Sequence, residues 1–535
     1  MNKSLLIAVL FVLLSGNSYA QKWKVYPYSP PNTLISFPRD EGIHPGEDSE
    51  WWYMFMKVKG QDTGDEYSIM FTFFHKDSLI FDGFRIFNVS NESTGEFLSD
   101  TKPLNFIKNA TGHLEITANV QGHKETWVTK KDADNKLIPF EYRLHATGDS
   151  MALDIDMSVI KHPLIIADSG YLHQGRFNYT YYYSFTEMEI KGVLKFKDRE
   201  EKISGKGWFD KQWGNFHPEV KEEYEWISIK LDNNVDINLW NIFDQSFNIP
   251  PTPTYRLFNC YIDDSTFFYT ADFEVNRLQY MYSPDSSRFY CKRFEIVQPD
   301  LHIHLTATVV NPNCEVLFPF PFYEGGIVVE GTYGRGVVKG FGFAELLHTY
   351  EKPELRLLTN PEAWDISKPI IWTIDNPDEG RPVFYDLLIS NEENSGYKYI
   401  LRGTRDTFAF LNESAVSLDS SYSLMITARS VDTLLTDTLK TTFNFYPSDT
   451  YTPQLQDKIK VYPNPTYGQV FVNTGGLKYD LLVVTDGQGK IIWQQKANGG
   501  NTTVIDTKSL KAGNYYIIVY LEGKAIAKAL IIHSL

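Results

Sequence analysis

Short stretches in which apolar and polar residues alternate dominate the chain, and turn-forming residues separate them. Almost no stretch shows the i, i+3, i+4, i+7 spacing of an amphipathic helix, so the pattern predicts an all-β protein. The strand-like runs are Tyr67–His75, Ile190–Phe196, Ile227–Leu231, Ile327–Val329, Tyr399–Leu401 and Leu424–Thr427.

Turn and charged clusters divide this pattern into parts. Residues 352–361 run from a Lys-Pro pair to a proline, and residues 447–457 combine Pro, Ser, Asp and Thr, so both predict linkers. A charged turn at 198–202 marks a further break inside a predicted hairpin. We therefore expect domains at 36–200, 201–351, 362–446 and 458–535.

Residues 362–446 have the pattern of a β-sandwich. Trp372 lies on an early predicted strand, Tyr385 on the next, and Tyr422–Ile426 on a late one. This arrangement predicts a fibronectin type III-like sandwich. Such modules act as spacers or adhesion units, and no polar constellation there suggests chemistry.

The N-terminus predicts export. Lys3 is followed by ten apolar residues, Leu5 to Leu14, and the small residues Ser18 and Ala20 lie three positions and one position before Gln21. This is the pattern of a signal peptide covering residues 1–20, and ten residues are too few to span a bilayer, which needs about 20. No second run approaches that length, so we expect no transmembrane segment.

Composition narrows the function further. The chain of 535 residues carries a net charge of −16 and shows no Lys/Arg cluster, which argues against nucleic acid as a partner. Its three cysteines, Cys260, Cys291 and Cys314, allow at most one internal disulfide. His302 and His304 form a pair on one strand face without an identifiable third ligand. Because phosphate-loop, dinucleotide and zinc-protease motifs are also absent, we expect no cofactor.

The chain offers aromatic and carboxylate constellations that can line a pocket. Glu50 and Trp52 share one strand face, where a buried carboxyl beside an indole would have a perturbed pKa. Phe73 and His75 also share a face. The alternatives are a rim salt bridge with core aromatics for the first pair and a hydrogen-bonded core histidine for the second.

A run of tyrosines gives the next candidates. Tyr181 and Tyr183 face one side of a predicted strand, and each hydroxyl needs a partner when buried. Pocket lining and core packing are both open for them.

The segment from Ser204 to Gly214 gives the principal chemical prediction. Trp208 and Asp210 lie on one strand face, with Trp213 nearby. An aspartic acid held against indole in a dry pocket has a raised pKa and can donate a proton, while the rings stabilise a developing cation. The alternative is a structural Asp that binds turn amides.

The last candidates lie in two later strands. Tyr323 and Glu324 follow a proline-rich turn, and Glu345 lies in an apolar strand. Glu345 is predicted either to be a buried partner for a pocket group or an inward edge charge that discourages aggregation.

The C-terminal segment resembles the sorting domain of type IX secretion cargo. It has Pro463-Asn464-Pro465, then Asp486-Gly487-Gln488-Gly489-Lys490, then a Leu-x-Ala-Gly-x-Tyr strand from Leu510. The resemblance covers 458–535 and implies a small β-sandwich, the type IX secretion machinery as a partner, and a secreted or cell-surface location.

Residues 36–350 resemble the carotenoid 1,2-hydratase superfamily, often labelled lipocalin-like secreted hydrolases. Six motifs occur in order: D-x-G-x-H-P, E-W-W-Y, Y-Y-Y-S, G-x-x-W-x-D-x-x-W-G, Y-E-G and G-x-x-E-L. The resemblance implies two tandem lipocalin-like β-barrels with a ligand cleft and, by position, Asp210 as the proton donor of a reaction without metal or nucleotide. This chain has Lys211 after that Asp, where family members often have His or Arg.

Together these observations predict an exported tandem-lipocalin protein that binds an apolar isoprenoid-, lipid- or polyketide-like molecule. If it is an enzyme, we expect acid-assisted hydration, isomerisation or cyclisation. A non-catalytic carrier or a surface adhesion protein are the alternatives, and both cleft hypotheses need a cavity of at least roughly 300 Å³. The expected catalytic residues are Asp210, Tyr183 and Glu50, and the expected ligand-binding residues are Trp52, Phe73, His75, Tyr181, Trp208, Trp213, Tyr323, Glu324 and Glu345.

Overall fold

The computed structural model describes residues 22–77, 80–217, 220–361, 364, 368–376, 380–391, 396–411, 421–444, 458–466, 468–486, 490–496, 500–511, 513–521 and 524–532. The predicted signal peptide and the predicted linker at 447–457 lie outside these residues. The chain forms two compact units, which divide after Tyr350.

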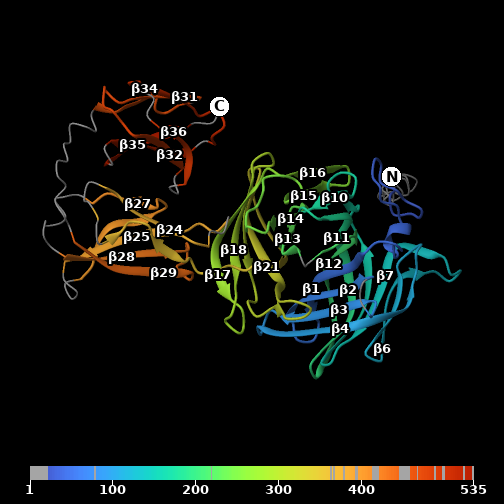
Figure 1. The fold of residues 1–535 in the computed structure, drawn as a ribbon. Helices are drawn as coiled ribbons and strands as arrows, with labels where there is room; N and C mark the ends of the chain where they lie inside the picture. The colour runs from blue at the N-terminus through green and yellow to red at the C-terminus, as the bar shows by residue number, and fades with distance from the viewer. Residues whose placement is uncertain are drawn as a thin grey trace, which may run out of the picture. The chain divides into compact units, whose positions relative to one another are not determined.

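The first unit begins with a closed barrel of ten strands (Figure 1). Eight strands follow one another around the wall, then β11 and β12 complete it, because β11 pairs with β8 and β12 pairs with β1. The strands are β1 Ser49–Gly60, β2 Glu66–Lys76, β3 Gly83–Asn91, β4 Glu96–Asn109, β5 Glu115–Val120, β6 His123–Lys131, β7 Leu137–Thr147, β8 Met151–Val159, β11 Asn178–Phe196 and β12 Arg199–Gly214. The short strands β9 (Leu164–Ile165) and β10 (Tyr171–Gln174) pair with β11, and the 3-10 helix η1 (Arg39–Glu41) precedes β1.

Alternation along each strand fills the barrel. On β1, Trp52, Met54 and Met56 point into a core of buried side chains, whereas Tyr53 and Phe55 belong to a second core on the outer face. Because side chains alternate between the two faces of a strand, β1 contributes side chains to both cores. The barrel interior is therefore packed, and the outer face of β1 has apolar surface for a further layer.

A second, open sheet supplies that layer (Figure 1). Its order is β16-β15-β14-β13-β22-β21-β19-β18-β17, with β20 added on β21, and among the described strands none joins β16 to β17. It is a half-barrel beside the closed one. Its strands are β13 Glu223–Leu231, β14 Asp236–Phe243, β15 Arg256–Asp263, β16 Thr266–Thr270, β17 Glu274–Tyr282, β18 Phe289–Gln298, β19 Ile303–Val309, β20 Glu315–Val316, β21 Phe322–Tyr333 and β22 Gly336–Leu346.

The charged turn near 198–202 joins β11 to β12. Both strands belong to the closed barrel, which continues to Gly214. The hairpin pairs Phe196 with Arg199 and keeps its register to Met188, where a β-bulge shifts the pairing by one residue. Beyond the bulge, Ser184 lies opposite Asp210.

The second unit holds two sandwiches, each with two small sheets around its own apolar core. The first pairs β23-β24-β27 with β26-β25-β28-β29, and the second pairs β30-β31-β34 with β33-β32-β35-β36. Bounds in the first are β23 Leu355–Leu357, β24 Ile370–Ile374, β25 Phe384–Ser390, β26 Lys398–Thr404, β27 Phe408–Ala409, β28 Ser421–Arg429 and β29 Thr436–Asn444. Bounds in the second are β30 Lys460–Tyr462, β31 Gln469–Asn473, β32 Leu481–Asp486, β33 Ile491–Lys496, β34 Thr502–Asp506, β35 Gly513–Leu521 and β36 Lys524–Ile532.

The all-β prediction and its six strand-like runs are confirmed. The three cysteines, all among the described residues, are buried thiols that no disulfide joins. The described part of the chain has no helix with the length and hydropathy needed to cross a bilayer.

Candidate functional site

A cavity of about 410 Å³ lies between the outer face of the closed barrel and the half-barrel. Barrel strands β1, β2, β3, β11 and β12 form one wall, and β13, β14, β21 and β22 form the other. Rings and aliphatic side chains make up most of its lining. The aromatic and aliphatic lining residues are Trp51, Tyr53, Met70, Phe74, Phe84, Ile86, Tyr182, Phe216, Tyr224, Trp226, Trp240, Ile242, Pro319, Phe320 and Phe322.

Asp210 lies on the barrel side of this cavity and is buried. Its Oδ1 accepts hydrogen bonds from Ser184 Oγ at 2.5 Å and from Trp208 Nε1 at 2.7 Å. Its Oδ2 accepts from the hydroxyl of Tyr182 at 2.8 Å. Strand alternation places Trp208 beside Asp210, as predicted, and the hairpin pairing places Ser184 opposite.

Tyr182 links Asp210 to the half-barrel. Its hydroxyl oxygen accepts hydrogen bonds from Asn238 Nδ2 at 2.8 Å and from Trp226 Nε1 at 3.2 Å. The same hydroxyl donates its hydrogen bond to Asp210. Burial raises the pKa of Asp210 to about 7, although the bonds from Ser184, Tyr182 and Trp208 act to lower it. Asp210 is thus a buried carboxyl whose pKa lies near neutral pH.

Two further carboxyls lie on the half-barrel side. Glu324 on β21 and Glu345 on β22 are direct cross-strand partners, and both line the cavity. The hydroxyl of Tyr53 donates to Glu324 Oε1 at 2.7 Å, and the hydroxyl of Tyr224 donates to Glu345. Burial, and then repulsion from Glu345, raise the pKa of Glu324 well above its usual range, and burial raises that of Glu345 to about 7.

The cavity offers these carboxyls almost no positive charge. Lys76 is the only Lys or Arg among the described lining residues. Its ammonium group donates to Asp48, to Ser49 Oγ and to the carbonyl of Phe216, so it is already occupied away from the three carboxyls.

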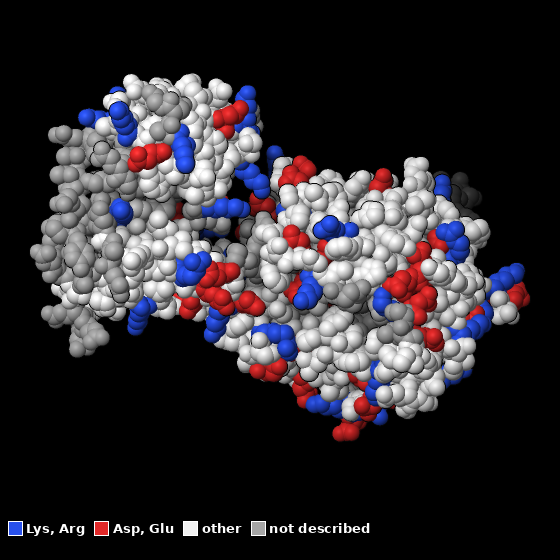
Figure 2. Space-filling view, viewed as in Figure 1, with Lys and Arg blue, Asp and Glu red and all other residues white. Residues whose placement is uncertain are grey.

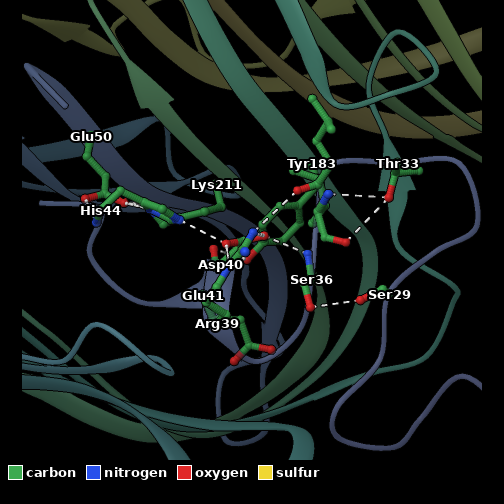
Figure 3. Close-up of polar contacts among 12 residues, drawn as sticks. Ser29, Thr33, Ser36, Arg39, Asp40, Glu41, His44, Glu50, Tyr183 and Lys211 are labelled. Carbon is green, nitrogen blue, oxygen red and sulfur yellow. Dashed lines mark hydrogen bonds and ion pairs between the residues drawn. The ribbon is translucent and has the colours of Figure 1, made fainter. Parts of the chain in front are cut away.

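A different polar cluster lies on the inner side of the barrel (Figure 3). Lys211 is fully buried, forms an ion pair with Glu50, and lies 3.9 Å from the centroid of the Trp52 ring. His44 Nδ1 lies 2.6 Å from Glu50 Oε1, and its Nε2 lies 3.1 Å from Asp40 Oδ1. These contacts form one chain from Asp40 through His44 and Glu50 to Lys211.

Rings enclose this inner cluster. His44 stacks on Trp213 with centroids 3.9 Å apart, and Tyr181 stacks on the same indole at 5.3 Å. Tyr183 is buried in the barrel core and donates to the carbonyl of Asp40 at 3.3 Å. Trp52 donates its indole N–H to the carbonyl of Glu41 at 2.8 Å.

The structure therefore divides the predicted site residues between two places. Asp210, Glu324 and Glu345 line the cavity, and Trp208, which does not line it, donates to Asp210. Tyr323 donates to the carbonyl of Asn311 and does not line the cavity. The remaining seven lie on the inner side of the barrel or at its rim: Glu50, Trp52, Phe73, His75, Tyr181, Tyr183 and Trp213.

Tyr182, Tyr53, Tyr224, Trp226 and Asn238 were not among the predicted site residues. If the register that starts at Phe196 continued unchanged, Phe185 would lie opposite Asp210. Tyr183 would then lie on the same face of the sheet as Asp210. The bulge shifts the register by one residue, and a shift of one residue exchanges the two faces of a strand. Tyr182 and Ser184 therefore face Asp210 instead.

Acidic and basic side chains are interspersed over the face shown in Figure 2, and no continuous basic field covers it. His304, one of the paired histidines, is exposed and bonds Glu295 at 2.8 Å.

Comparison with known proteins gave two family matches. An AttH-like model matches residues 28–350, and a secretion system C-terminal sorting domain matches residues 460–533. These matches confirm both resemblances inferred from the motifs. The sorting domain indicates secretion to the cell surface or beyond it. The search of curated proteins gave no match.

A solved structure agrees on the fold. An AttH protein of Nitrosomonas europaea superposes with a TM-score of 0.50 at 18% identity, covering 60% of this chain and 99% of its own. Kievitone hydratase of Nectria haematococca gives 0.48 at 15% identity, covering 61% and 98%. At 18% identity the likeness to the AttH protein concerns the fold alone. Since the family model spans more than half of its residues, the chain belongs to the AttH-like family.

Proposed function

We propose that this secreted protein binds an apolar small molecule in the cavity between its two large sheets and transfers a proton to it from Asp210. The reaction is a hydration, isomerisation or cyclisation. The observation that carries the proposal is a buried carboxyl, poised near neutral pH, on the wall of an aromatic cavity of about 410 Å³. That volume exceeds the roughly 300 Å³ needed for a small-molecule site.

The chemistry follows from the groups around the cavity. Protonated Asp210 gives its proton to a double bond of the bound molecule, which leaves a cation on the adjacent carbon. The rings of Trp226, Trp240 and Tyr53 line the same cavity, and aromatic rings stabilise positive charge near them. Tyr182 holds the carboxyl in place through its bond to Oδ2. A general acid with a pKa close to the working pH contributes about 10²–10⁴-fold to the rate.

The cation is then resolved by proton loss. In a hydration, water adds to the cation and its extra proton goes to Glu345, so that one water is consumed and the two carboxyls exchange roles. In an isomerisation or cyclisation, Glu345 takes a proton from carbon instead. We assign Tyr183 and Glu50 to the barrel interior, because neither lines the cavity.

The test uses Asp210→Asn in the full-length secreted protein. Native mass spectrometry should show a co-purifying molecule on both proteins, with substrate on the variant and product on the wild type. A hydratase predicts that the two differ by the mass of one water, and an isomerase or cyclase predicts equal masses with different chromatographic retention. Asp156→Asn, an exposed position on β8, is the matched control and should behave like the wild type.

If the same molecule is bound to both proteins, the protein is a carrier and the catalytic part of the proposal is wrong. If neither protein carries a small molecule, and Trp240→Ala leaves the spectrum unchanged, the cavity is not a ligand site.

A further inference from the structure

The cavity contains a polar group without a partner. Glu324 is 1% exposed, and its Oε2 has no hydrogen-bond partner among the described residues. Its other oxygen is bound by Tyr53, so Oε2 is the atom left for a ligand. A buried carboxyl oxygen without a partner is strongly disfavoured, and a bound molecule that supplies a hydrogen bond removes this penalty.

The surroundings define the charge of that molecule. Three carboxyls, Asp210, Glu324 and Glu345, face the cavity, and the hydroxyls of Tyr53, Tyr182 and Tyr224 bind them. The nearest positive candidate, Lys76, is bound to Asp48 and Ser49. No described lining residue therefore compensates an added negative charge.

We propose that the cavity selects its ligand by charge: it takes an apolar molecule whose polar head is neutral or cationic and hydrogen-bonds Glu324 Oε2, and it rejects anionic lipids such as fatty carboxylates. This inference rests on the proposed function, because it assumes that the cavity is the ligand site.

Electrostatics gives the reason. A carboxylate brought beside buried carboxyls must either take up a proton or meet like charge at low dielectric. An ammonium head forms a charge-assisted hydrogen bond with the same oxygens, and the indole faces of Trp226 and Trp240 attract it further. A hydroxyl head forms the hydrogen bond but lacks the attraction between opposite charges.

The test compares three probes of one shape: naphthylethylamine, naphthylethanol and naphthylacetate. Isothermal titration calorimetry on the full-length protein at pH 8 keeps the amine cationic and the acid anionic. We expect the amine to bind at least about tenfold more tightly than the carboxylate, with the alcohol between them.

Glu324→Gln keeps the shape but cannot ionise, so an ammonium head no longer finds a carboxylate partner there and the amine preference should fall at least about threefold. The matched control is Glu41→Gln, a buried carboxyl inside the barrel whose pKa burial also raises, to about 8. It should leave the ranking unchanged.

A carboxylate that binds as tightly as the amine to the wild type would overturn the charge inference while leaving the cavity as a ligand site. An unchanged ranking in Glu324→Gln would also overturn it. If none of the three probes binds, both the proposed function and the charge inference fail. This result differs from the two above, which overturn the charge inference alone.

Discussion

Two neighbouring residues on β12 face opposite sides of the same wall and meet opposite environments. Lys211 points into the barrel, where it pairs with Glu50. Burial alone would raise the pKa of Glu50, but the Lys211 ammonium and His44 hold it below its usual value. Asp210 points into the cavity, where only neutral donors reach it, and burial raises its pKa to about 7.

The comparison separates two uses of a buried carboxyl. With a cation beside it, the carboxyl stays ionised and serves the barrel as a structural link. Without one, it keeps a proton close to neutral pH and is available for proton transfer. Burial is the same on both sides of β12, so the partner decides.

The largest expected effect comes from removing the cation of the inner pair. Lys211→Met leaves Glu50 buried without its ammonium partner, with only His44 still bound to it, and such a change costs about 3–5 kcal/mol. Hydrogen exchange of the β1 and β12 amides in the full chain measures this loss. The double variant Lys211→Met/Glu50→Gln should recover a large part of it. A single variant within 1 kcal/mol of the wild type would contradict the pairing.

The second effect is a pH dependence of opposite sign on the two sides. Because the folded pKa of Asp210 lies above its unfolded value of about 4, its stabilising contribution is full below pH 4 and is lost as the pH rises through 7. Asp210→Asn removes this dependence. Relative to the wild type it should therefore gain about 2–4 kcal/mol between pH 4 and pH 8.

Glu50→Gln provides the opposite sign. The folded pKa of Glu50 is lowered, so its contribution is present above the unfolded pKa and is lost as the pH falls. The variant should lose most stability at neutral pH and least in acid. Denaturant titrations at both pH values test the pair, and parallel curves for the two variants would remove the distinction between the two sides.

The third effect concerns the bulge that orients Tyr182. Lys230 on β13 donates to the carbonyl of Thr186 at 2.7 Å and contacts Glu187 at 3.2 Å, and both residues lie within the bulge. Lys230→Met also removes the ion pair with the buried Asp236, so within a total loss of about 1–3 kcal/mol the bulge contacts are measured by faster exchange of the β11 amides. Lys206→Met removes the more exposed ion pair to Glu187 and should cost less than about 1 kcal/mol. Equal losses would argue against the bulge contact.

The smallest effect distinguishes two adjacent tyrosines. Tyr182→Phe removes a hydrogen bond that lowers the pKa of Asp210, so that pKa should rise by about one unit. Tyr183→Phe removes only a bond to the carbonyl of Asp40 and should leave it unchanged. Infrared difference spectroscopy of the carboxyl stretch over a pH series measures both. A shift in the Tyr183 variant would show that the two faces are coupled.

The strand pattern predicts most of the fold because alternation is a local property. Tyr67–His75 lies within β2 and Leu424–Thr427 within β28, as expected. Closure is a different matter: whether a sheet becomes a full barrel or a half-barrel depends on which distant strands pair. The pairing of β8 with β11 closes one sheet, and no local sequence pattern predicts this pairing.

The site is predictable only in part, for a related reason. Asp210 and Trp208 are two residues apart, so their shared face follows from strand geometry. The partner strand carries a bulge at Thr186 and Glu187, which changes the tyrosine that faces Asp210 from Tyr183 to Tyr182. The bulge depends on tertiary contacts such as that of Lys230, which a single sequence does not display.

The placement of the cavity outside the barrel makes the shape of the cavity and the integrity of the barrel separable. One wall of the cavity belongs to the closed barrel, and the other wall belongs to the open sheet. Substitutions at Trp226, Trp240 or Ile242 can reshape the cavity while the backbone hydrogen bonds of the closed barrel stay in place. Under the proposed function, ligand preference can change through the half-barrel alone while Asp210 on β12 stays in place.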